Sequence, residues 1–151
     1  MMSKYSRMTP ASISDTLEAN TQYAVNEAPW SALSSAESSF AEYGDAAIVV
    51  LSRSGGEGAD LPSGENGTSD SWISGQEGDG NYLALSAEEI ELLQNLKALK
   101  DNGTFKNIIV LINSSNAIEL DFLNPEICGE DYGIDAAMWI GEVGQTGING
   151  V

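Results

Sequence analysis

Apolar and polar positions follow one another along the chain in blocks that predict strands and helices in turn. Residues 46–52 form an apolar, β-branched run, residues 108–113 form a second, and residues 136–140 form a shorter third. Apolar runs without polar alternation are typical of parallel strands that are covered on both faces. We therefore expect three buried, parallel strands.

Helical periodicity separates the predicted strands. Ser86-Ala-Glu-Glu89 has the spacing of a capping box, and leucine and isoleucine recur after it at helical intervals until Asp101-Asn102-Gly103. A second helix is predicted over residues 29–43, with Gly44 as its end, and a short helical piece near residues 118–123. This order of helices and strands is that of a parallel α/β sheet.

Three regions fall outside this pattern. Residues 1–28 are mostly polar, and we interpret them as an N-terminal arm or linker before a domain at 29–151. Residues 53–84 are rich in Gly, Ser, Asn and acids, and a loop of this length is usually functional or mobile. After residues 141–147, a second strand-to-helix turn, only the first turns of a helix follow. We therefore expect an incomplete sheet in a domain that is truncated at its C-terminal end.

The turn after the first strand carries the residue of most interest. Gly55-Gly56-Glu57-Gly58 places one acid among glycines, which allow backbone turns that a β-carbon forbids. Functional groups of open α/β sheets gather on the loops that leave the carboxyl ends of the strands. Glu57 is therefore expected at the mouth of the sheet, with Arg53 and Asp60 beside it. The alternative is an exposed glutamate on a structural loop.

Composition excludes several classes of function. Six Lys and Arg against 23 Asp and Glu give a formal charge of −17, which disfavours nucleic-acid partners. No apolar run is long enough to span a membrane and no signal peptide precedes the domain, so we expect a cytoplasmic protein without a membrane partner. Cys128 is the only cysteine and fits a reducing compartment. Histidine is absent, which excludes Ser-His-Asp triads, Cys-His pairs and ordinary zinc catalysis.

Two further features leave alternatives open. The glycine-rich residues 55–58 and 141–147 resemble phosphate-binding loops, but neither ends in Lys-Ser/Thr and each contains an acid that would repel phosphate. We therefore expect no bound nucleotide. We also expect no other cofactor and no metal. Trp72 either stacks on a sugar ring or anchors its segment to the core. Trp30 and Trp139 are interpreted as core residues.

Four motifs together resemble the α/β sandwich domain of family 3 glycoside hydrolases, the β-glucosidase group. They occur in the family's order with plausible spacing, and Ser115 and Ala117 stand where the family often has Gly and Pro. The motifs cover residues 47–60, 83–89, 109–120 and 135–147.

The resemblance implies a three-layer α/β/α sandwich with a mostly parallel, flavodoxin- or Rossmann-like sheet. It also implies a retaining mechanism, which needs a carboxylate nucleophile and a second carboxyl group as acid/base. In the family the nucleophile lies on a separate barrel domain, and the sandwich domain supplies the acid/base glutamate. Glu57 matches that glutamate, Arg53 and Asp60 match residues beside it that orient the loop or contact sugar, and Trp72 is the candidate for sugar stacking.

The barrel domain has no counterpart in this chain, so we expect the chain by itself not to hydrolyse glycosides. Its expected partners are a β-glucoside or oligosaccharide substrate and a barrel domain with the nucleophile. An open sheet edge or uncovered sheet face would also favour self-association. The alternative function is a non-catalytic carbohydrate-binding or assembly module with the same fold.

Overall fold

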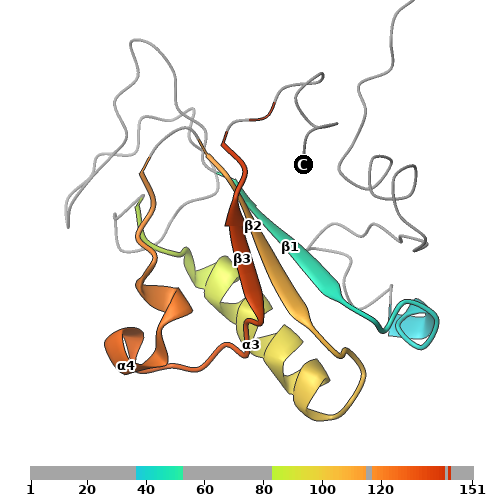
Figure 1. Ribbon diagram of the computed structural model, residues 1–151. Helices are drawn as coiled ribbons and strands as arrows, with labels where there is room; N and C mark the ends of the chain where they lie inside the picture. Colours follow the sequence, from blue (N-terminus) through green and yellow to red (C-terminus); the bar gives the residue numbers. More distant parts are fainter. Residues whose placement is uncertain (1–36, 53–82, 115–116, 142, 144–151) are drawn as a thin grey trace, which may run out of the picture.

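The computed structural model describes residues 37–52, 83–114, 117–141 and 143 of the chain (Figure 1). Its three strands form one all-parallel sheet in the order β1-β2-β3, so the α/β fold predicted from the sequence is confirmed. The elements are, in chain order, the 3-10 helix η2 (Glu37–Ser39), β1 (Ala47–Ser52), α3 (Ala87–Asp101), β2 (Ile108–Asn113), the 3-10 helix η3 (Asp121–Leu123), α4 (Pro125–Cys128) and β3 (Ala136–Trp139).

The strands pair in a register that aligns their ends. Ala47 pairs with Ile108 at the start of β1 and β2, and Ser52 pairs with Asn113 at their end. β3 pairs with β2 from Ile109 to Ile112. Because all three strands run in the same direction, their carboxyl ends meet at one edge of the sheet (Figure 1).

Helix α3 connects β1 to β2 and begins at the predicted capping box. The Ser86 side chain accepts a hydrogen bond from the Glu89 backbone N–H at 3.2 Å, and the Ser86 N–H donates to the Glu89 carboxylate at 2.9 Å. The helix ends before Asn102, and Gly103 follows with a φ of 86°. Both ends of this helix were predicted from local sequence, because capping and termination depend on neighbouring residues.

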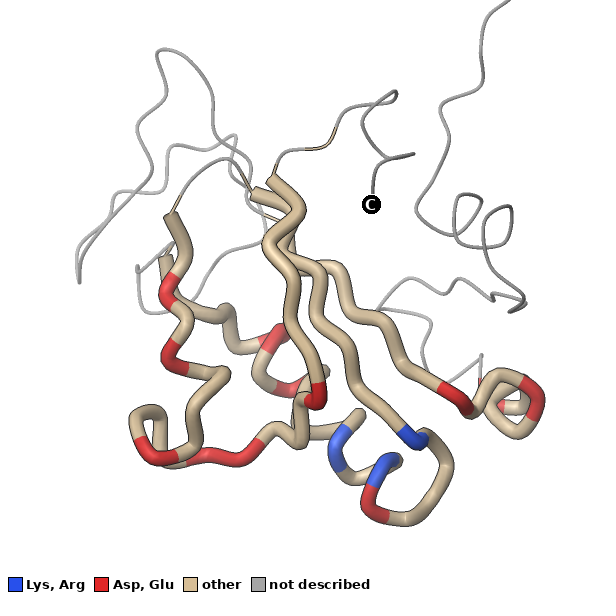
Figure 2. The backbone as a smooth tube through the Cα atoms, viewed as in Figure 1, with Lys and Arg blue, Asp and Glu red and all other residues tan. Residues whose placement is uncertain are grey.

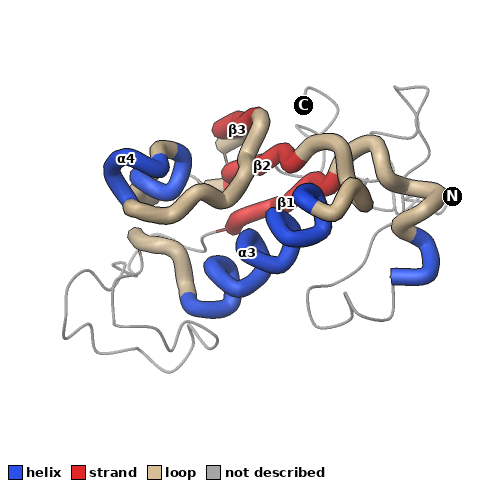
Figure 3. The backbone as a smooth tube through the Cα atoms, turned by 90° about the horizontal axis from the view of Figure 1, so that it is seen from below, coloured by secondary structure: helices blue, strands red, loops and turns tan. Residues whose placement is uncertain are grey.

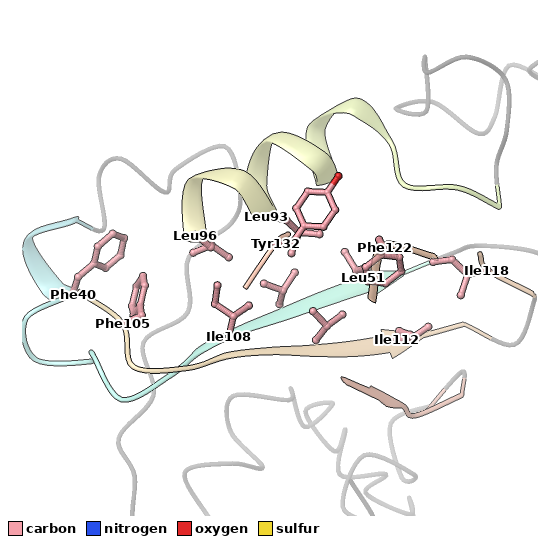
Figure 4. Packing of buried hydrophobic residues seen from close by; sticks show 12 residues of the cluster. Phe40, Leu51, Leu93, Leu96, Phe105, Ile108, Ile112, Ile118, Phe122 and Tyr132 are labelled. Atoms are coloured by element: carbon pink, nitrogen blue, oxygen red, sulfur yellow. The ribbon is translucent and has the colours of Figure 1, made fainter. Parts of the chain in front are cut away.

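The hydrophobic core lies between α3 and one face of the sheet (Figures 3 and 4). Leu93 of α3 and Ile108 of β2 are both fully buried. The connection from β2 to β3 contributes Phe122 and Tyr132 to the same cluster. The cluster contains Phe40, Val49, Leu51, Leu93, Leu96, Phe105, Ile108, Val110, Ile112, Ile118, Phe122 and Tyr132.

The expectation that both faces of the strands are buried holds for the central strand β2, but it is wrong for β1 and β3. Ile48 and Val50 of β1 are 40% and 41% exposed, and Met138 of β3 is 53% exposed. The cause is topological. The strand order equals the chain order, and right-handed crossovers that step in one direction put α3 and the described part of the β2–β3 connection on the same face. The described residues therefore form two layers, and the predicted third layer is not among them.

The helix predicted over residues 29–43 is corrected where the structure describes it. Residues 29–36 lie outside the described residues, and over 37–43 the chain has the short helix η2 and a turn. Phe40 packs against Phe105 with ring centroids 5.0 Å apart. At Gly44 a β-carbon would lie 2.7 Å from the Thr104 carbonyl oxygen, so the chain passes too close to the α3–β2 turn for any other residue.

The helical piece predicted near residues 118–123 is present only as η3, and α4 was not predicted. Asn124 caps α4, because its side chain accepts from the Glu126 N–H at 3.0 Å. Pro125 stands at the first turn, and Gly129, with a φ of 79°, ends the helix. Asn-Pro followed by Gly is a recognisable start and stop, but the helix between them is too short to show periodicity.

Candidate functional site

The four residues predicted for the site all belong to residues 53–82, which lie outside the described residues. They are Glu57, Arg53, Asp60 and Trp72. What the structure describes is the sheet edge from which this segment starts, since Arg53 follows Ser52, the last residue of β1.

The carboxyl edge of the sheet is polar where the strands end. Ser52 and Asn113 are the last residues of β1 and β2, and they are partners in the register. Ser114 follows Asn113 and is the one fully buried polar residue in the described part of the chain. Hydroxyl and amide groups therefore replace the apolar pattern of the strands at this edge.

Hydrogen bonds tie the chain after β3 to the chain after β2. The Trp139 indole N–H donates to the Ser114 carbonyl at 2.8 Å. The Val143 N–H donates to the Asn113 side-chain oxygen at 3.2 Å, and the Ile140 N–H continues the ladder to the Ile112 carbonyl at 2.9 Å. These bonds join the described residues at the ends of two neighbouring strands.

Trp139 corrects the prediction that it belongs to the core, because it is 45% exposed. Its N–H needs an acceptor, and the Ser114 carbonyl at the strand end supplies one. The sequence indicated this exposed location only through the position of Trp139 near the end of a short apolar run. Trp30, the other tryptophan assigned to the core, lies outside the described residues.

The N-terminus of α3 lies toward the same edge, because a helix that joins parallel strands runs back along them. Its first turn carries Glu88 and Glu89. In the capping box, the side chains of Ser86 and Glu89 each accept a hydrogen bond from the other residue's backbone N–H. A phosphate group approaching this helix end would meet two carboxylates. The geometry of this helix end therefore does not favour phosphate binding.

The opposite edge, where the strands begin, carries a cluster of charged side chains (Figure 2). The Lys100 ammonium lies 2.6 Å from the Asp135 carboxylate and donates to the Gly133 carbonyl at 2.8 Å. Asp135 also accepts from the Ile108 backbone N–H at 2.7 Å. The Lys100 hydrogen bond, followed by that from Ile108, lowers the pKa of the Asp135 carboxyl below its ordinary value. This cluster joins α3, β2 and β3, which is a structural role.

The remaining described lysines are also paired with acids. Lys97 lies 2.7 Å from Asp101 on the same face of α3, and Lys106 forms an ion pair with Asp45. Each of the three lysines of residues 83–114 is therefore paired with an acid.

The connection around α4 brings together a thiol and a phenol. The Cys128 thiol donates to the Glu130 carbonyl at 3.0 Å. Burial, with smaller contributions from Cys128 and Glu130, raises the pKa of Tyr132. Tyr132 is buried in the core and stays protonated, so it has a packing role.

Neither a metal centre nor a membrane span is found in the described part of the chain. Within residues 37–52, 83–114 and 117–141, no three His, Cys, Asp or Glu side chains are grouped so that they could hold a metal ion. The described helices include none with the length and apolar character needed to cross a membrane. Comparisons of the chain with protein-family models, with curated proteins and with solved structures found no match.

Proposed function

We propose that the chain is the α/β sandwich part of a retaining, β-glucosidase-like glycoside hydrolase, in which Glu57 is the general acid/base. The observation that supports this proposal is the all-parallel sheet, whose β1 ends at Ser52, five residues before Glu57. Five residues of extended chain span at most roughly 18 Å, which is the greatest distance from the end of β1 that the covalent connection allows for Glu57. Catalytic groups of open α/β folds lie at this edge.

The chemistry requires a second carboxylate. A nucleophile on a barrel domain attacks the anomeric carbon while the Glu57 carboxyl donates its proton to the glycosidic oxygen, and the leaving group departs as an alcohol. The Glu57 carboxylate then accepts a proton from the water that hydrolyses the glycosyl-enzyme. A neighbouring nucleophile charge and exclusion of water would raise the pKa of Glu57 enough for the first step.

Three residues near Glu57 in the sequence are proposed to contact the substrate. Arg53 and Asp60 carry groups that hydrogen-bond to sugar hydroxyls, and Trp72 offers an aromatic surface for the apolar face of a sugar ring. The exposed Trp139, the last residue of β3, offers an aromatic side chain at the carboxyl edge, which supports the proposal of a carbohydrate surface there.

The first experiment asks whether the chain completes an active site. It is mixed or co-expressed with a family 3 barrel domain, and hydrolysis of an aryl β-glucoside is measured. We expect activity only when both parts are present, because each carries one of the two carboxyl groups. Absence of activity with every barrel domain, together with retained sugar binding by the chain, would favour the non-catalytic module instead.

The second experiment assigns the role of Glu57 in the reconstituted enzyme. We expect Glu57→Gln to lower kcat/KM by about 10²–10⁴-fold for alkyl glucosides, whose leaving groups need a proton. For glucosides of acidic phenols, kcat/KM should fall far less, because these leaving groups depart without a proton. Azide should accelerate turnover by Glu57→Ala, because azide attacks the glycosyl-enzyme without a general base. Glu65→Gln, an acid of the same segment, is the matched control. Equal losses for all leaving groups would exclude the acid/base role.

A further inference from the structure

Strand β3 forms one edge of the sheet in the described part of the chain (Figure 1). On one side it pairs with β2, and no further strand pairs with it within residues 37–52, 83–114 and 117–141. All four residues of the strand, Ala136–Trp139, are exposed. The backbone N–H and C=O groups on the open side of an edge strand can pair with a strand of another chain.

The hydrogen bonds to β2 decide which backbone groups of β3 point to the open side. The Ile140 N–H donates to the Ile112 carbonyl, so the backbone groups of Ile140 point toward β2. Because the backbone groups of successive strand residues point to alternate sides, those of Met138 also point toward β2. The N–H and C=O groups of Ala137 and Trp139 therefore point away from β2, to the open edge.

The sequence of β3 lacks the side chains that keep an edge strand from pairing. It reads Ala-Ala-Met-Trp and contains neither a charged residue nor proline. Natural edge strands are commonly protected by lysine, by proline or by an inward-pointing charge. The acid that precedes the strand, Asp135, is already paired with Lys100. The open edge of β3 is therefore uncharged along its whole length.

A second copy of β3 matches this edge in the antiparallel orientation. With a two-fold axis beside Met138, Ala137 of each copy stands opposite Trp139 of the other. These are the residues whose backbone groups point outward, so each of the two pairs can exchange two hydrogen bonds. Met138 then stands opposite Met138 of the second copy, at a position where the strands exchange no hydrogen bond and the apolar side chains lie close together.

The net charge of −17 does not oppose this arrangement at the edge itself. Like charges directly opposite each other on neighbouring strands are destabilising, and β3 has none. Antiparallel pairing puts the two copies of Asp135 at opposite ends of the paired strands, about 20 Å apart. That distance exceeds the Debye length of about 8 Å at physiological ionic strength.

We propose that β3 pairs with β3 of a second copy about a two-fold axis at Met138, so that two three-stranded sheets join into one of six strands. A contact between identical surfaces of this kind closes after two copies. Its paired edge is only four residues long, so the dimer forms in a concentration-dependent manner. This proposal does not depend on the proposed catalytic role.

Disulfide formation tests the position of the axis. Each cysteine variant is made in the full chain together with Cys128→Ser, oxidised and analysed by non-reducing electrophoresis. We expect Met138→Cys to form a linked dimer, because the two Cα atoms lie about 4.5 Å apart, within reach of a disulfide. Ala136→Cys, on the same face of β3, is the matched control. Its two copies lie about 14 Å apart along the strands and should not be linked.

Sedimentation equilibrium tests the dimer without a cross-link. Met138 is 53% exposed, so Met138→Lys leaves the core intact but places two like charges opposite each other at the axis. We expect the dimer dissociation constant to rise at least about tenfold. Ile127→Lys, at a side chain that is 70% exposed on α4, changes the net charge equally and should leave the constant unchanged. If Met138→Lys does not fold, Ala137→Pro removes an outward N–H without affecting the bonds to β2.

Three outcomes overturn the proposal. A wild-type chain that is monomeric at about 1 mM has no such dimer, and amides of Ala137 and Trp139 protected from hydrogen exchange in that monomer would mean that its own chain pairs with β3. Equal linkage of Met138→Cys and Ala136→Cys would mean random collision instead of a fixed register. Species larger than a dimer would mean that β3 pairs with a different strand.

Discussion

Asp135 shows how one side chain joins three elements. It stands immediately before β3, accepts from the first backbone N–H of β2 and receives the ammonium of Lys100 from α3. Both interactions require the ionised carboxylate, which is why the pKa of Asp135 is lowered. With 38% of its side chain exposed, the pair with Lys100 is partly screened by water.

The lowered pKa gives a pH-dependent contribution to stability. A carboxyl group whose pKa is lower in the folded state stabilises the fold above its unfolded pKa, about 3.9, and this contribution is lost as pH falls through the folded value. We expect Asp135→Asn to reduce the free energy of unfolding by about 1 kcal/mol at neutral pH, because it weakens two charge-assisted hydrogen bonds.

Urea unfolding across a pH series measures this effect. The difference between wild type and Asp135→Asn should shrink as the pH falls from the unfolded pKa, about 3.9, through the lowered folded pKa of Asp135, below which both chains carry a neutral group. Asp101→Asn, which removes the exposed pair with Lys97, is the control and should change stability little. A difference that is independent of pH would contradict the ionised role.

Helix α3 is the element whose structure follows most directly from local sequence. Its capping box is complete, and Leu93 and Leu96 face the core as the apolar periodicity predicts. The prediction was wrong at η2, where tertiary packing defines the chain path, and it missed α4, which is defined by its caps alone. Phe40 against Phe105 and the close approach at Gly44 involve residues more than 50 positions apart, which local patterns do not report.

Removal of the cap tests the local contribution. We expect Ser86→Ala to lower the free energy of unfolding by about 1 kcal/mol, because the Glu89 N–H loses its acceptor and the reciprocal bond loses its support. Urea unfolding followed by far-UV circular dichroism measures the change. Ser86→Asp should restore most of the loss, and Ser38→Ala in η2 is the matched control. Equal effects at both serines would rule out a capping contribution.

At the scale of the molecule, the core on one face of the sheet supplies the packing energy. Leu93 is 0% exposed between α3 and the strands, and Ile127 on α4 is 70% exposed. We expect Leu93→Ala to cost about 2–5 kcal/mol through lost burial and a residual cavity, and Ile127→Ala to cost less than about 0.5 kcal/mol. Chemical unfolding of both variants measures the contrast, and similar losses would show that the core lies elsewhere.

The sequence by itself determined the elements with local or continuous signals. Three apolar runs predicted the strands, the capping box predicted α3, and their order predicted a parallel sheet. These features depend on backbone preference and on neighbouring residues, so they can be deduced without knowledge of distant contacts.

Only the tertiary structure decided which faces are covered and which edges are joined. An apolar run does not reveal that α3 and the described part of the β2–β3 connection pack on one side of the sheet, while Val50 and Met138 stay exposed. Nor does it reveal that Trp139 turns its N–H to Ser114, or that Asp135 and Lys100 meet across 35 positions. These features result from crossover handedness and from contacts between distant residues, which arise only when the elements pack together.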